Sequence, residues 1–214
     1  MKQKKISVLT PSIRPAGLKI VQECLAKQSF KDFEWLVEIG IPETGHDLNA
    51  AFNRMLKRAS GELIVFYQDY IKIQADGLEQ FWNAYQRDKN TFFTAPVGKT
   101  MNWTDIQWDW RNNPVVDMNF QRWEIDWGAA PREALLKIGG FDELLDDYWS
   151  FDNVDTGLRA SLEGYKFQNV WTNKAIAYDH DKLIEHPFRV KYNPEFVNQR
   201  LDEIRRGLRF NYLQ

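Results

Sequence analysis

Hydrophobic and polar positions follow two different periods along the first hundred residues. Short, nearly continuous apolar runs with the pattern of buried strands fall at 6–9, 33–39, 63–67 and 91–97. Apolar residues recur every three or four positions, and so predict helices, at 18–28, 48–59 and 76–87. Because these strands and helices alternate with short connections, the pattern predicts crossover units. The expected fold is therefore α/β, with a mostly parallel, doubly wound sheet.

The second hundred residues show a weaker pattern. The segment 98–128 is long, polar and rich in aromatic residues, without a clear period. After it, the sequence predicts helices at 131–138, 152–163 and 194–208 and strands at 167–171 and 175–178. Since the sequence has no linker rich in Gly, Pro or Ser, we expect residues 1–214 to form one domain whose two halves share a core.

Charge and cysteine usage narrow the class of protein. The formal net charge of -2 predicts no broad surface for a polyanion, although a local basic stripe is compatible with it. Cys24 is the only cysteine, which rules out an intrachain disulfide and favours a reducing, cytoplasmic location. The sequence has no apolar stretch approaching ~18 residues, so we expect no membrane span.

Three predicted strands end in polar residues. These ends are 10–14, 38–40 and 68–70, and in a parallel sheet they meet at one edge, where ligands of such folds bind. The sequence contains no GxGxxG, GxxxxGK[ST] or GxSxG motif, so it is not a usual dinucleotide-binding protein, P-loop enzyme or α/β-hydrolase. The remaining class is a doubly wound fold that binds nucleotides with the loops at its strand ends.

Several segments, taken in order, resemble the family 2 glycosyltransferases, which have the GT-A fold. The segments are 5–15 (KISVLTPSIRP), 25–37 (LAKQSFKDFEWLV), 49–53 (NAAFN), 59–66 (ASGELIVF), 139–142 (GGFD), 152–159 (DNVDTGLR) and 164–165 (GY). The resemblance covers roughly residues 5–180. It implies a Rossmann-like sheet with a fused acceptor-side region: a nucleotide-sugar half over about 1–98, an acceptor and catalytic half over about 99–190, and a C-terminal helix over 191–214.

The resemblance implies a hexosyltransferase-type enzyme that moves a sugar from a nucleotide-sugar donor, with UDP favoured, to an acceptor hydroxyl, with inversion. The residues at the family's donor-binding positions are Thr10, Pro11, Arg14, Glu38, Asn53, Gln68 and Asp69. Glu38 is at the position of an acid that accepts from the uracil ring, or it is an exposed residue of an edge strand. The first loop, with Arg14, packs on the base and ribose.

The family's metal motif is incomplete in this sequence. Where the family has DxD, this chain has Gln68-Asp69-Tyr70, and only the middle residue is acidic. The resemblance implies that Asp69, with His180, holds Mg²⁺ or Mn²⁺ on the donor diphosphate. The alternatives are that metal binding is weak or absent and that Asp69 caps a turn.

The family's catalytic base is also replaced. Asn153 falls at its position, and an amide is not a useful proton acceptor. Asp152 is the nearest substitute, and Asp155, almost one helical turn further on, is a candidate supporting residue. In the alternative interpretation, Asp152 is the N-cap of the helix and Asp155 interacts with the helix dipole.

Five tryptophans lie between residues 103 and 127. Aromatic faces stack on sugar rings and on nucleobases, so this segment is a candidate acceptor platform; a second core over the sheet is the alternative. We expect Trp108 and Trp110 to be the exposed ones, because polar residues surround them.

Two other functions stay open at this stage. One is a nucleotidyltransferase, although its first loop would need more basic residues than Arg14. The other is a binding domain for a nucleotide or glycan that no longer turns over. For a transferase, the acceptor is a glycan or, less favoured, a modified base in DNA. We expect the final helix to dock on the domain, with its arginines in solvent.

Overall fold

The computed structural model describes residues 4–40, 47–102, 104–146, 152–178 and 194–213. Its helices are α1 (Pro15–Ala26), α2 (Leu48–Arg58), α3 (Gly77–Arg87), α4 (Arg132–Lys137), α5 (Asp152–Leu162) and α6 (Pro194–Arg205). Its strands are β1 (Ile6–Ser12), β2 (Phe33–Ile39), β3 (Leu63–Tyr67), β4 (Ile71–Ile73), β5 (Thr91–Thr94), β6 (Val97–Thr100), β7 (Gln107–Trp108), β8 (Trp127–Pro131), β9 (Lys166–Asn169) and β10 (Ala175–Tyr178). Short 3-10 helices lie at Trp110–Asn112, Phe120–Arg122 and Glu143–Leu145.

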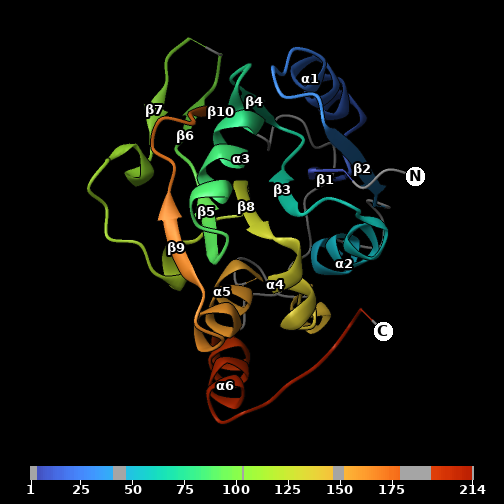
Figure 1. Ribbon diagram of the computed structural model, residues 1–214, viewed down its shortest axis with the longest axis vertical. Coiled ribbons are helices and arrows are strands. Elements are labelled where there is room, and N and C mark those ends of the chain that lie inside the picture. The colour runs from blue at the N-terminus through green and yellow to red at the C-terminus, as the bar shows by residue number, and fades with distance from the viewer. Residues whose placement is uncertain (1–3, 41–46, 103, 147–151, 179–193, 214) are drawn as a thin grey trace.

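The larger sheet has the strand order β2-β1-β3-β8-β5-β9. Strand β1 is parallel to both β2 and β3, and β5 is parallel to β9. Strand β8 runs antiparallel to β3 and to β5, between which it lies (Figure 1). The predicted α/β class and mostly parallel sheet are confirmed. The reversed strand β8 was not predicted, because its sequence WGAAP is short and poor in β-branched residues.

The predicted strand at 91–97 is wrong in its extent. The chain leaves the larger sheet after Thr94 and enters a smaller sheet, of order β4-β10-β6-β7, at Val97. Pro96 lies between the two and has no N–H to give to a continuous ladder. Its carbonyl instead accepts from the N–H of Ala175 at 2.9 Å. The segment 98–128, which carried no clear period, supplies β6, β7 and two short 3-10 helices.

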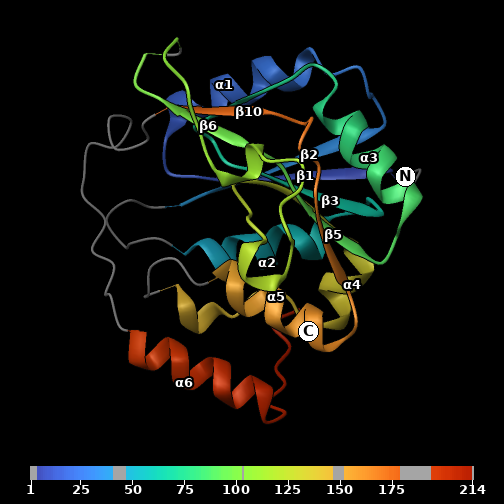
Figure 2. The same cartoon turned by 90° about the vertical axis from the view of Figure 1, so that its left-hand side faces the viewer.

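Apolar side chains cover both faces of the larger sheet. On one face Val8, Val65 and Trp127 pack with α1 and α3, and on the other face Phe66 and Phe92 pack with α2, α4 and α5. Figure 2 shows these two helical layers, with α6 as a further layer beside α5. Burial on both faces is the reason that the central strands read as continuous apolar runs.

The first turn of α2 is capped by a carboxylate from another part of the chain. Asp47 occupies the N-cap position, but its carboxylate makes no capping hydrogen bond and pairs with Arg54 at 2.7 Å. The backbone N–H groups of Asn49 and Ala50 donate instead to the two carboxylate oxygens of Asp146, at 2.6 and 3.0 Å. A carboxylate from far along the chain thus satisfies the free N–H groups of the first turn.

Asn53 ties α2 to the turn at Gly139–Phe141. Its amide nitrogen donates to the carbonyl of Phe141 at 2.9 Å, and its amide oxygen accepts from the N–H of the same residue at 2.8 Å. Gly139 and Gly140 have φ values of 83° and 81°, a conformation that favours glycine. The turn is therefore held by both its backbone conformation and a buried amide.

Helix α6 docks on the domain as expected, but the expectation that its arginines lie in solvent is wrong for Arg200, whose side chain is 12% exposed and pairs with Asp142. Its residues Val197, Leu201 and Ile204 are buried in a cluster with Leu145 and Leu158. Among the described helices, none is long and apolar enough to cross a lipid bilayer.

Replacing Asn53 tests the tie to the glycine turn. In Asn53→Ala, the buried N–H and carbonyl of Phe141 both lose their partner, so we expect the free energy of unfolding to fall by about 3 kcal/mol. Urea denaturation followed by circular dichroism measures the change. Lys57→Ala, at an exposed position of the same helix, is the matched control and should cost less than about 0.5 kcal/mol. Equal small losses in both variants would contradict the structural role of Asn53.

Candidate functional site

The carboxyl ends of β1, β2 and β3 meet the start of β8 at one edge of the larger sheet. Because β8 is antiparallel to β3, its first residue, Trp127, pairs with the last residue of β3, Tyr67. The N–H of Gln68 then donates to the carbonyl of Asp126 at 3.2 Å. The polar strand ends therefore gather as expected, and the residues before β8 join them.

Asp69 lies at this edge in a buried ion pair. Its side chain has no exposed area; it accepts from the Ser12 hydroxyl at 2.5 Å and lies 3.2 Å from Nε of Arg14. Arg14 is itself only 7% exposed. The end of β1 and the end of β3 are thus joined by opposite charges inside the protein.

Gly17 allows this arrangement by its lack of a side chain. A Cβ atom on Gly17 would lie 2.2 Å from the backbone carbonyl oxygen of Asp69, which real Cβ atoms do not approach. The first turn of α1 therefore rests directly on Asp69. This close contact fixes the position of the residue that stands in the middle of Gln68-Asp69-Tyr70.

A second arginine holds two carboxylates beside the first pair. Arg111, which is buried, donates through its two terminal nitrogens to the two oxygens of Asp126, at 2.5 and 2.7 Å. It also donates through Nε to Asp109 at 2.9 Å. Burial alone would raise the pKa of Asp126, but the charge and hydrogen bonds of Arg111 hold that pKa below its ordinary value. Asp126 is therefore a stable carboxylate at neutral pH.

Tyr70 lies between the two arginine–carboxylate groups. The Arg14 guanidinium carbon is 5.0 Å from the centre of its ring, a cation–π contact. Burial raises the pKa of the Tyr70 hydroxyl well above its ordinary value; Asp126 and Asp69 add to the rise, and Arg14 and Arg111 oppose it. The four charged side chains are thus near enough to act on one phenol, which remains protonated at neutral pH.

A cavity of about 570 Å³ opens beside this group. Tyr70 and Asp126 line it from the larger sheet. Residues of the smaller sheet and of the turn after β6 complete the wall; among them are Lys99, Thr100, Asn102, Gln107 and Tyr178. Its volume falls in the range of small-molecule sites, and its wall is rich in hydrogen-bonding groups.

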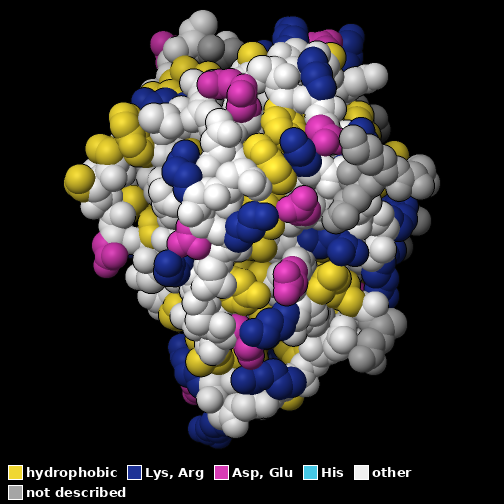
Figure 3. Space-filling view, viewed as in Figure 1, with side chains coloured by type: hydrophobic (Ala, Val, Ile, Leu, Met, Phe, Trp, Pro, Cys, Tyr) yellow, Lys and Arg dark blue, Asp and Glu magenta, His cyan; other side chains and the backbone are white. Residues whose placement is uncertain are grey.

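A second cavity, of about 770 Å³, lies over the segment between β7 and β8. Trp108, Trp110, Asp109, Asp117, Arg122 and Glu124 are among its lining residues. Trp108 and Trp110 are 36% and 42% exposed, as predicted, whereas Trp123 and Trp127 are fully buried. The tryptophan-rich segment therefore contributes both to the core and to the surface. In Figure 3, hydrophobic side chains lie at the left-hand side of the molecule, where Figure 1 places the segment between β7 and β8.

Cations lie over both exposed indoles. Lys174 Nζ is 5.0 Å from the ring centre of Trp108, and the guanidinium carbon of Arg122 is 5.8 Å from that of Trp110. The Arg111 guanidinium carbon is 6.0 Å from the ring centre of Trp110. Such contacts hold an exposed ring in one orientation.

The predicted nucleotide-binding residues near β1 and β2 are only in part at a surface. Pro11, Arg14 and Glu38 line a small hollow of about 10 Å³. Thr10 is fully buried, and its hydroxyl accepts from Trp35 Nε1 at 2.9 Å. Glu38 is held by two arginines of α2, Arg54 at 3.1 Å and Arg58 at 2.5 Å.

The other predicted site residues fall in three groups. Asn53 and Gln68 are buried, and Asn53 uses both of its N–H bonds on Phe141 and Glu143. Asp152 is the first residue of α5, with a side chain outside the described residues, and His180 lies outside them altogether. The assigned roles of these residues stay predictions.

Asp155 lies away from both cavities. It is fully buried and pairs with Arg159 at 2.5 Å, and Arg159 donates in turn to the carbonyls of Ile138 and Gly140 at 2.7 and 2.6 Å. Burial raises the pKa of Asp155 and Arg159 opposes that rise. The observed contacts hold the glycine turn, and the supporting role of Asp155 in catalysis remains a prediction.

The described residues do not by themselves form a metal site. No group of three or more His, Cys, Asp or Glu side chains suited to a metal lies within the described ranges. Asp69 faces Arg14, whose guanidinium supplies positive charge where a cation would supply it. The role of Asp69 as a metal ligand stays a prediction.

The sequence did not point to three residues of this site: Arg111, Asp126 and Glu124. All lie in the segment without a clear period, and their partners are distant in sequence. The one available signal was that Asp126 directly precedes the apolar residues 127–131.

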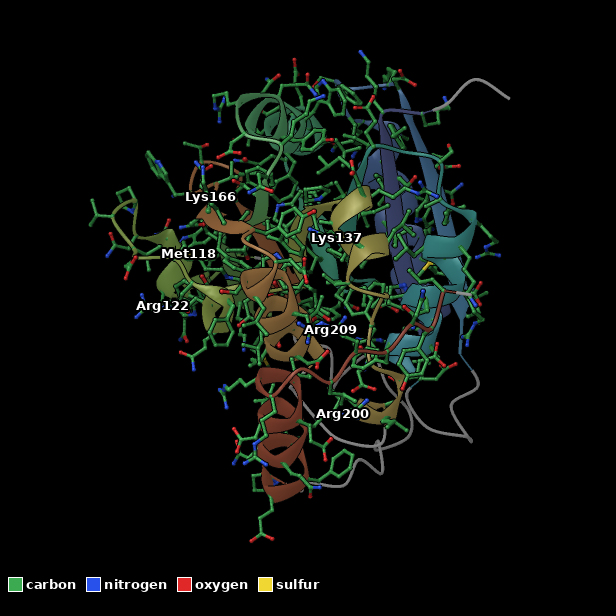
Figure 4. The ribbon with its side chains drawn as sticks, turned by 60° about the horizontal axis from the view of Figure 1, so that its bottom comes forward. Met118, Arg122, Lys137, Lys166, Arg200 and Arg209 are labelled. Carbon is green, nitrogen blue, oxygen red and sulfur yellow. The ribbon has the colours of Figure 1, made fainter. Side chains whose placement is uncertain are left out.

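Each basic side chain labelled in Figure 4 has a partner. Lys137 pairs with Glu163 at 3.0 Å, Lys166 with Asp88 at 2.9 Å, and Arg200 with Asp142 at 2.5 Å. Arg122 and Arg209 donate to backbone carbonyls, and Arg122 also lies at the larger cavity. These pairs lower the net positive charge that this side of the molecule offers to a polyanion.

No protein-family model matches the sequence, and no curated protein matches it. The structure, in contrast, is similar to TarS of S. aureus. Residues 1–349 of TarS in complex with UDP-GlcNAc match with a TM-score of 0.67 and 14% identity, over 92% of this chain and 64% of that chain. A second structure of TarS 1–349 gives a TM-score of 0.62 and 15% identity, over 83% of this chain and 61% of that one.

A third structure, titled only as TarS, gives a TM-score of 0.61 and 16% identity, over 84% of this chain and 37% of that one. This chain thus spans less than two thirds of the length of the TarS chains that it matches. At such identities the similarity concerns the fold alone. The chain has the α/β GT-A fold of the glycosyltransferase TarS, with a mixed and mostly parallel sheet.

Proposed function

We propose that this protein is a glycosyltransferase that uses a UDP-sugar as its donor. The observation that carries the proposal is the polar cavity of about 570 Å³ at the carboxyl edge of a GT-A sheet, beside Tyr70 and Asp126. This is the edge at which open α/β sheets bind ligands. TarS, the similar structure, was crystallised with UDP-GlcNAc, which favours UDP over other nucleotides for this chain.

Arg14 supports an anionic ligand at this edge. Its Nη1 atom is buried and has no hydrogen-bond partner within the part of the chain that the structure describes. A buried guanidinium N–H without an acceptor is costly, and phosphate oxygens are among the strongest acceptors for arginine. We infer that a phosphate oxygen of the donor accepts from Arg14.

The two cavities suit the two substrates of sugar transfer. The two cavities share two segments of the chain. Gln107 and Asp126 line the smaller cavity, and their near neighbours Trp108 and Glu124 line the larger one. We assign the donor to the smaller cavity and the acceptor to the larger one, where Trp108 and Trp110 offer aromatic surface to a sugar ring. The acceptor oxygen then attacks the anomeric carbon from the side opposite the diphosphate, which inverts that carbon.

Donor binding is the first prediction of this proposal. UDP-GlcNAc at a hundred times its dissociation constant should stabilise the protein by about 2.7 kcal/mol, a clear rise in melting temperature. Differential scanning fluorimetry with UDP-, GDP- and CMP-sugars measures it and identifies the nucleotide. The same titration with Mn²⁺ tests the predicted metal ligands: stronger binding would support Asp69 and His180, and equal binding would retire them. No stabilisation by any nucleotide would instead favour a domain without transferase function.

The Arg14 contact has its own test. Arg14→Lys keeps the positive charge beside Asp69 but loses the fork of N–H donors, so we expect UDP to bind about tenfold more weakly. Isothermal titration with UDP measures the change. Arg87→Lys, at an exposed position at the end of α3, is the matched control and should bind as the wild type does. Unchanged affinity in Arg14→Lys would remove Arg14 from the donor site.

The acceptor assignment predicts an effect of Trp110. An array of glycans and of DNA carrying hydroxymethylated bases identifies the acceptor class. With that acceptor, Trp110→Ala should raise KM about tenfold, the size expected for losing one stacking contact, and leave donor affinity unchanged. Trp171→Ala is the control, since Trp171 is 44% exposed and lines neither cavity. Equal effects of the two variants would argue against an aromatic acceptor platform.

A further inference from the structure

The smaller cavity, of about 570 Å³, has both hydrogen-bond donors and carboxylates in its wall. The side chains of Lys99, Asn102 and Gln107 are able to donate. Among the described residues of the wall, the carboxylates are those of Asp105 and Asp126. A hydroxyl group donates as well as accepts, so a site that distinguishes sugars needs an acceptor in a fixed position. The two carboxylates differ in how the protein holds them.

Asp105 lies in the turn between β6 and β7 and is exposed. Its carboxylate accepts from the side-chain nitrogen of Asn102 at 2.8 Å, and Asn102 is exposed as well. An exposed carboxylate on a turn can rotate toward solvent. Asp105 therefore offers the cavity negative charge without a fixed direction.

Asp126 is held through both of its carboxylate oxygens. The two terminal nitrogens of Arg111 donate to Oδ1 and Oδ2, at 2.5 and 2.7 Å, and the N–H of Trp127 donates to Oδ1 at 2.8 Å. These three bonds leave part of the capacity of a carboxylate, which has about four lone-pair sites. The side chain of Asp126 is 24% exposed and lines the cavity. It can therefore accept one more hydrogen bond, from a group in the cavity.

Arg111 is itself fixed by residues of several elements. Its buried guanidinium donates to the Thr94 hydroxyl of β5 at 3.2 Å and to Asp109 at 2.9 Å. Its backbone carbonyl accepts from the Asn169 amide of β9 at 2.6 Å. A forked pair between a guanidinium and a carboxylate fixes direction as well as distance. Asp126 thus presents its free capacity to the cavity in one orientation.

Tyr70 connects this carboxylate to the proposed phosphate contact. Tyr70 lines the cavity with Asp126, and its ring centre lies 5.0 Å from the guanidinium carbon of Arg14. The charges of Asp126 and Arg14 both act on the pKa of the Tyr70 hydroxyl, so both lie close to one phenol. A donor whose phosphate accepts from Arg14 therefore has its sugar within reach of Asp126.

We propose that Asp126 is a specificity-determining residue of this protein, which accepts a hydrogen bond from a hydroxyl group of the donor sugar. The inference rests on the proposed use of a UDP-sugar and names the residue that distinguishes one sugar from another. A hydroxyl bonds more strongly to an ionised acceptor than to a neutral one. A sugar without a hydroxyl group at that position leaves this bond unmade, and the site then binds it more weakly.

The affinity for a UDP-sugar relative to that for UDP tests the contact. The probes are UDP, UDP-GlcNAc and UDP-glucose, measured by isothermal titration. In Asp126→Asn, the affinity for the better-bound UDP-sugar should fall about tenfold, the loss expected for a hydrogen bond to a charged group. The affinity for UDP, which lacks the transferred sugar, should stay within about threefold of wild type. An equal loss for UDP would place the contact on the nucleotide and overturn the proposal.

Asp109→Asn is the matched control. Asp109 pairs with the same arginine but lines the larger cavity. Its replacement disturbs Arg111 without removing the carboxylate from the smaller cavity, so it should change the affinities for UDP and the UDP-sugar by the same factor. A selective loss of the UDP-sugar in Asp109→Asn, as large as in Asp126→Asn, would show that a displaced arginine causes the effect. That result would also overturn the contact.

Fluorinated donors test the same contact in a protein with Asp126 in place, which covers the case that Asp126→Asn does not fold. Deoxyfluoro analogues of the better-bound UDP-sugar replace each sugar hydroxyl in turn, and fluorine cannot donate a hydrogen bond. One analogue should bind about tenfold more weakly than its parent, in the wild type and in Asp105→Asn alike. Equal affinities for all analogues would overturn the proposal. A sensitivity that Asp105→Asn abolishes would assign the hydroxyl to Asp105 and overturn it as well.

The failure of the proposed function gives a different result. If the wild-type protein binds neither UDP-GlcNAc nor UDP-glucose, the proposed donor fails, and the role of Asp126 fails with it. If the wild type binds a UDP-sugar, but Asp126→Asn keeps the wild-type ratio of affinities, only the role of Asp126 fails.

Discussion

The edge of the larger sheet depends on the reversed strand β8. Because β8 runs against β3 and β5, its amino end lies beside their carboxyl ends, and Asp126 comes within reach of Arg111. A buried guanidinium between carboxylates is strongly coupled to its partners: removing one partner of such a pair costs about 3–5 kcal/mol, since it leaves an unpaired charge. The same reversal brings Asp126 beside the Asp69–Arg14 pair. Buried ion pairs therefore hold the residues of the polar edge in place, as apolar packing holds the layers behind it.

Two kinds of carboxylate result from this construction. Asp69 and Asp126 each pair with an arginine at the polar edge, Asp69 with Arg14 and Asp126 with Arg111. Glu124, two residues before Asp126, accepts from the amide of Asn153 at 3.3 Å and lines the larger cavity. The segment before β8 thus supplies one carboxylate to the polar edge and another to the larger cavity.

The sequence predicted the parts of this fold in which local pattern and tertiary environment agree. Strands β1 and β3 are buried on both faces, so their apolar runs were unambiguous, and α2 follows a clear helical period. Strand β8 was missed because Gly128 is there for a close approach to Glu124, and a residue chosen for that contact weakens the strand signal. No local pattern pointed to Asp146, whose carboxylate accepts from the first turn of α2, because it is about a hundred residues away from that turn.

For the candidate site, the sequence predicted which strand ends carry polar residues but not which side chains contact one another. Strand ends are visible in a sequence, and from them Arg14 and Asp69 were predicted to lie at this edge of the sheet, where they form an ion pair. Which charges meet is set by contacts of long sequence separation, such as that of Asn153 with Glu124, and no local pattern encodes them. An asparagine at the position where the family has its base reads, in sequence, as a lost function. In the structure that amide holds a carboxylate of another segment at a cavity, so a substitution at the expected residue is weak evidence for loss of activity unless the surrounding carboxylates are known.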